Sequence, residues 1–103
     1  MDDEMKRFAL AAVNRLDALL ERGADASHAE IKAAVDGVIA WRNRAIEKHR
    51  TGSASRHCLD KANSLASLAF GIEFPLSGFH LNRIRQTRDG LDAFLRTGNS
   101  AAV

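Results

Sequence analysis

Apolar side chains recur at steps of three and four residues through most of the chain, a spacing that puts them on one face of an α-helix. Phe8 belongs to the first such stripe and Phe79 to the last. Stretches with Gly, Ser, Thr or Pro separate the stripes, and these residues end helices. The pattern predicts four helices, over about residues 3–22, 28–50, 55–70 and 78–96.

Residues at the predicted helix ends agree with these limits. The segment Ser27-His28-Ala29-Glu30 fits a capping box, in which Ser27 and Glu30 each accept a backbone N–H of the other. Gly23 is suited to end the first helix, because glycine adopts the left-handed conformation without penalty. Either Ser53 or Ser55 can cap the third helix.

Three short connections make successive helices antiparallel neighbours. We therefore expect an all-α fold, an up-down-up-down four-helix bundle. A chain of 103 residues is enough for one domain, residues 1–103, in which 99–103 form a flexible tail.

Composition excludes several other classes of protein. A hydrophobic content of 46% is too high for intrinsic disorder, and one Pro with 7 Gly is too little for a many-stranded sheet protein. No apolar run has the roughly 20 residues that span a bilayer, and the acidic start, 1–4, has the wrong charge for a signal peptide. The lone Cys58 predicts a reducing cytoplasm.

The connector between the third and fourth helices is unusually apolar for a loop. We take its large apolar residues as candidates for partner binding: Phe70, Ile72, Phe74, Leu76 and Phe79. They either close the end of the core or form an exposed patch for a second copy or another protein. Because the core of so short a chain is thin, self-association is expected.

Residues 42–57 form the most basic part of the chain, with Glu47 as their one acid. Four of them are anion-binding candidates: Arg44, Lys48, Arg50 and Arg56. Such a cluster can hold phosphate or nucleic acid beside a helix N-terminus. It can equally serve the negative end of the second helix, neutralised by the acidic start of the chain. Arg85 and Arg88 would extend a phosphate groove if they align with this cluster.

Arg42 is followed by Asn43 and, after six intervening residues, by His49. This spacing resembles the motif of HEPN-type ribonucleases, which are helical bundles that pair as dimers over RNA. The resemblance implies that His49 transfers a proton and that Arg42 stabilises the phosphorane-like transition state. Arg pairs with phosphate through two donors, and His titrates near neutral pH.

The remaining chemistry-bearing residues form no pattern. The four histidines, at positions 28, 49, 57 and 80, are scattered and predict no metal site, and no glycine-rich loop predicts a cofactor. The sequence therefore favours a non-enzymatic interaction or regulatory protein, acting as a homodimer. A HEPN-like ribonuclease is the first alternative. Nucleic-acid or phosphate binding through residues 42–57 is the second.

Overall fold

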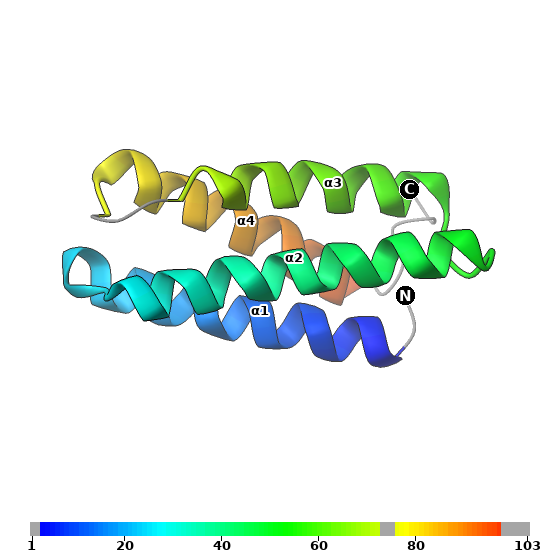
Figure 1. Ribbon diagram of the computed structural model, residues 1–103, viewed down its shortest axis with the longest axis horizontal. Helices are drawn as coiled ribbons and strands as arrows, with labels where there is room; N and C mark the ends of the chain where they lie inside the picture. Colours follow the sequence, from blue (N-terminus) through cyan, green and yellow to red (C-terminus); the bar gives the residue numbers. More distant parts are fainter. Residues whose placement is uncertain (1–2, 73–75, 98–103) are drawn as a thin grey trace.

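A computed structural model of the protein describes residues 3–72 and 76–97 (Figure 1). The described chain is helical: α1 (Asp3–Arg22), a short 3₁₀ turn η1 (Gly23–Asp25), α2 (His28–Arg50), α3 (Arg56–Phe70) and α4 (Gly78–Thr97). The predicted all-α class and the four helices are confirmed, with ends that differ from the prediction by no more than one residue. The predicted tail, 99–103, lies outside the described residues.

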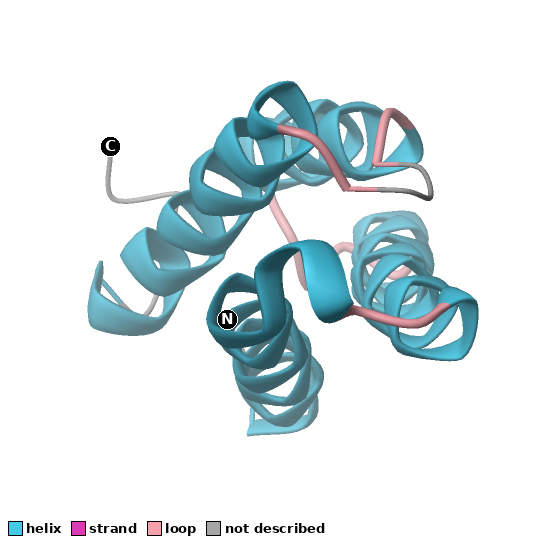
Figure 2. Ribbon diagram, turned by 90° about the vertical axis from the view of Figure 1, so that its left-hand side faces the viewer, coloured by secondary structure: helices cyan, strands magenta, loops and turns pink. Residues whose placement is uncertain are grey.

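The helices form a closed ring in which α1 contacts α2, α2 contacts α3, α3 contacts α4, and α4 returns to α1. Figure 1 shows that successive helices run in opposite directions along an elongated body of 41 × 21 × 20 Å. In the view along the long axis the helices surround a common centre (Figure 2). The start of α1, the end of α4 and the α2–α3 loop share one end of the bundle, and the α3–α4 connector is at the other.

Local hydrogen bonds explain where α2 begins. Ser27 Oγ accepts from the backbone N–H of Glu30 at 3.1 Å, and Glu30 Oε1 accepts from the backbone N–H of Ser27 at 3.0 Å. The hydrogen bond from the Ser27 backbone N–H is the main reason that the pKa of the Glu30 carboxyl is lowered. Gly23 has a φ of +55°, so α1 ends at the left-handed residue that the sequence predicts.

The other helix starts use the same kind of cap. Ser55, rather than Ser53, caps α3 by accepting from the backbone N–H of Cys58 at 3.0 Å. Before α4, the backbone N–H of Ser77 donates to Nδ1 of His80 at 3.2 Å. His80 therefore acts as the glutamate does in the capping box of α2.

The core surrounds Trp41, the largest fully buried side chain, whose ring meets Phe94 edge to face with centroids 5.1 Å apart. Val13 of α1 is also buried. Phe8 and Phe79 belong to the apolar stripes in the sequence, yet the structure exposes 37% and 64% of these residues. Both lie at the edge of their stripe, where the neighbouring helix does not cover them.

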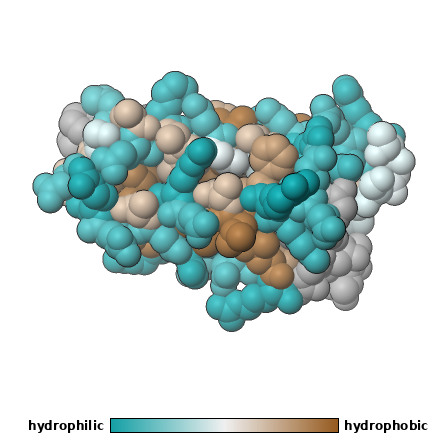
Figure 3. All heavy atoms as spheres, turned by 90° about the horizontal axis from the view of Figure 1, so that it is seen from below, coloured by the Kyte–Doolittle hydropathy of each residue, from teal (hydrophilic) through white to brown (hydrophobic). Residues whose placement is uncertain are grey.

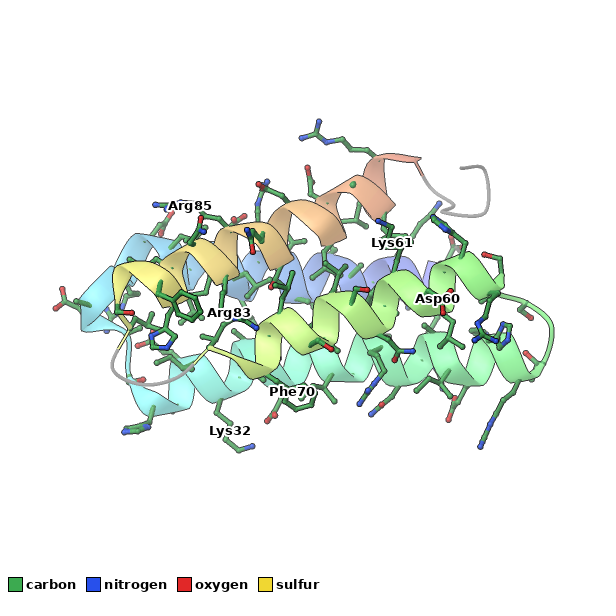
Figure 4. The ribbon with its side chains drawn as sticks, turned by 90° about the horizontal axis from the view of Figure 1, so that it is seen from above. Lys32, Asp60, Lys61, Phe70, Arg83 and Arg85 are labelled. Carbon is green, nitrogen blue, oxygen red and sulfur yellow. The ribbon has the colours of Figure 1, made fainter. Side chains whose placement is uncertain are left out.

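Helix α4 approaches α3 closely at a glycine. A Cβ placed on Gly90 would lie well inside van der Waals contact with Cδ2 of Leu65, which is buried. In Figure 4, α4 begins beside α3 and moves away from it toward its own C-terminus. From the sequence, Gly90 is expected only to lower the stability of its helix. In the structure it leaves space for the Leu65 side chain.

Two interior helical glycines give opposite predictions. We expect Gly90→Ala to destabilise the fold by about 1 kcal/mol, because overpacking against Leu65 outweighs the better helix propensity of alanine. We expect Gly37→Ala to stabilise it by about 0.5–1 kcal/mol, because its Cβ would meet the backbone of Ala12 at an ordinary 3.7 Å. Thermal and urea unfolding measure both. Equal shifts of the two variants would contradict the close contact at Leu65.

Candidate functional site

The apolar connector divides into a buried part and an exposed part. Ile72 and Leu76 are only 5% and 7% exposed and belong to the hydrophobic core. Phe70 and Phe79, which flank them at the end of α3 and the start of α4, are 57% and 64% exposed. Phe74 lies outside the described residues. Ile72 and Leu76 therefore close the end of the core, while the flanking Phe70 and Phe79 rings are exposed. We call Phe70 and Phe79 the connector surface.

The two rings of the connector surface have different surroundings. Phe70 projects from α3 on the side of α2 (Figure 4). Phe79 is flanked by two side chains of its own helix: the guanidinium of Arg83 lies over its ring at 5.5 Å, and the His80 ring meets it edge to face at 5.6 Å. Phe79 is thus exposed to solvent and held in place.

A second group of exposed apolar side chains lies on α1. Figure 3 shows the face that α1 presents, with apolar atoms gathered near its middle among polar ones. The large exposed apolar residues of α1 are Phe8 and Leu10. An open hollow beside Phe8 is lined by Glu4, Arg7, Phe8 and Ala11. The sequence gives no signal for Leu10 or for this hollow, because a lone leucine opposite an apolar stripe is common on surface helices.

Carboxylates neutralise part of the basic segment at the opposite end of the bundle. Arg44 forms ion pairs with Glu4 of α1 and with Glu47. Arg56 pairs with Asp60 one helical turn on, at 3.2 Å. The start of α1 therefore lies against the basic segment, as the position of its acids suggests. Arg50 is exposed, and Lys48 has interactions of its own.

The residues that resemble the ribonuclease motif are all on α2. Nε of Arg42 donates to the side chain of Asn43 at 3.0 Å, and Nδ1 of His49 donates to the carbonyl oxygen of Ala54 at 3.0 Å. Both Arg42 and His49 are half-buried. Seven residues along one helix separate them by about 10 Å. Their backbone positions are therefore about two helical turns apart on α2.

Arg85 and Arg88 do not align with the basic segment of α2, because α4 packs against α1 and α3. Nε of Arg88 donates to Asp17 of α1 at 2.9 Å, and its Nη1 lies 3.4 Å from Asp89 and 3.8 Å from Asp92. The hydrogen bond to Asp17 is the main reason that the pKa of Arg88 is raised. The condition for a phosphate groove across the two helices is not met.

Within residues 3–72 and 76–97, no three His, Cys, Asp or Glu side chains gather as a metal ion would require. No helix in that part of the chain combines the length and apolar character needed to cross a membrane. Comparisons with protein-family models, with curated proteins and with solved structures find no match.

Proposed function

We propose that this chain is a small, non-enzymatic interaction protein of the cytoplasm, which associates with a second copy of itself through the connector surface. The observation that carries the proposal is the exposure of Phe70 and Phe79, 57% and 64%, beside core residues that already close the end of the bundle. Since Ile72 and Leu76 fill that end, the two exposed rings are not needed to complete the core.

Binding energy and side-chain entropy both favour a partner on the connector surface. Aromatic side chains dominate the binding energy of protein interfaces when they are central and become desolvated. Phe79 is held by Arg83 and His80 before any partner arrives, so binding costs little side-chain entropy. A short chain with a thin core also gains stability from each apolar contact that association adds.

We predict that Phe79→Asp weakens self-association at least tenfold, because a charge replaces a ring at the interface. Its helical circular dichroism and melting temperature should stay close to those of the unchanged chain, since the residue is 64% exposed. Sedimentation equilibrium over a wide concentration range measures the association.

Leu10→Asp is the matched control, because Leu10 is 51% exposed on α1 rather than at the connector. It should leave the dissociation constant unchanged. If Leu10→Asp alone lost association, the interface would lie on α1 and not on the connector surface. A monomeric unchanged chain at every concentration would overturn the proposal.

A HEPN-like ribonuclease is the second candidate, and one observation favours it. The hydrogen bond from Nδ1 of His49 to Ala54 fixes the ring and leaves Nε2 as the nitrogen that could accept a proton. Such an orienting bond is common for a proton-transferring histidine. Because the ribonucleases that the motif resembles pair as dimers over RNA, this candidate also requires two copies of the chain.

The interaction proposal predicts that the purified protein leaves single-stranded RNA intact in buffer without divalent ions. Denaturing gel electrophoresis after prolonged incubation measures this outcome. Cleavage that His49→Ala abolishes, with unchanged helical circular dichroism, would replace the interaction proposal by the ribonuclease. Cleavage that survives His49→Ala comes from a contaminating nuclease. Further purification should then remove both that nuclease and the cleavage.

A further inference from the structure

Arg83 of α4 connects the end of α3 to Phe79. Its Nε donates to the carbonyl oxygen of Leu68 at 3.0 Å, and its Nη2 donates to that of Ser67 at 3.1 Å. The last carbonyls of a helix carry partial negative charge, which a guanidinium complements. The Leu68 carbonyl also accepts from the backbone N–H of Gly71 at 3.2 Å, so Arg83 is its second donor. The same guanidinium lies over the Phe79 ring at 5.5 Å.

Gly71 makes this position of Arg83 possible. A Cβ on Gly71 would overlap Nε, Cζ and Nη2 of Arg83. The backbone of Gly71 has a φ of −84°, which any residue adopts, so the glycine is needed for space and not for its conformation. The atoms it makes room for are the far end of a flexible side chain, which alanine would displace at small cost.

We propose that Arg83 is the positioning residue of the connector surface: it caps α3 and fixes the Phe79 ring in the orientation that a second copy of the chain meets. The proposal rests on the function proposed above. It assigns Arg83 no contact with the partner; its effect on association passes through Phe79. Gly71 belongs to the same arrangement, because it leaves the space that the guanidinium fills.

Two substitutions disturb this arrangement in different ways. Arg83→Gln removes the guanidinium, and Gly71→Ala displaces it while every charge is kept. If both act on the one contact, the double variant should behave as Arg83→Gln alone, because the guanidinium that the added methyl group would displace is already gone. Arg85→Gln is the matched control, since the exposed Arg85 projects away from α3 in Figure 4 and has no bonded partner in the described chain.

The first measurement is the fluorine NMR spectrum of protein labelled with 4-fluorophenylalanine, recorded at high dilution, with the Phe79 signal assigned by Phe79→Leu. We expect Arg83→Gln and Gly71→Ala to shift the Phe79 signal, the double variant to match Arg83→Gln, and Arg85→Gln to leave it unchanged. An unmoved Phe79 signal in Gly71→Ala, or shifts that add in the double variant, would overturn the proposal.

The second measurement is the dissociation constant of self-association. We expect each of the two substitutions to weaken association about two- to fivefold, the size of an exposed cation–π contact, and to have no further effect once Phe79 is replaced by Leu. Absence of association in the unchanged chain would refute the proposed function, while the Phe79 signal still decides the role of Arg83. Association that Gly71→Ala and Arg83→Gln leave unchanged would refute the role of Arg83 alone.

Discussion

Two close contacts bring α4 against α3, and a glycine lies at each of them. Gly90 admits the Leu65 side chain, and Gly71 admits the guanidinium of Arg83. Glycine inside a helix, as at Gly90, is destabilising by itself, by about 1 kcal/mol relative to alanine. Here that loss is offset by the packing of a buried leucine and by hydrogen bonds to the last carbonyls of α3.

The two ends of the bundle are therefore different in character. At one end, ion pairs of Arg44 and Arg56 with nearby carboxylates balance part of a basic segment. At the other end, buried Ile72 and Leu76 close the core, and Phe70 and Phe79 remain exposed around them. An exposed charge pair such as Arg56 with Asp60 contributes little and is easily screened. Covering an exposed aromatic ring with a partner, in contrast, gives a favourable free energy of burial. This contrast is the physical reason to look for a partner at the connector end.

Much of the fold could be predicted from the sequence, because helical periodicity and caps are local properties. The limits of the four helices and the capping box at Ser27 and Glu30 follow from residues three or four positions apart. The sequence could not show that Ile72 is buried and Phe79 exposed, because their burial depends on how the helices pack. The roles of Gly71, Gly90 and Arg83 were missed for the same reason: each depends on a contact between two helices. For Arg83, no periodic signal distinguishes an arginine that caps a neighbouring helix from one on a solvated face.

Phe70 and Phe79 lie exposed on the surface, and in the proposed dimer a second copy of the chain covers them. Hydroxyl-radical footprinting at low and at high protein concentration tests both the exposure of the two rings and their burial by a second copy. The account predicts that Phe70 and Phe79 react quickly in dilute protein and become protected in concentrated protein, while buried Phe94 reacts slowly in both. Slow reaction of Phe79 in dilute protein would contradict the display of the ring. Rapid reaction that persists at high concentration would contradict its burial by a second copy.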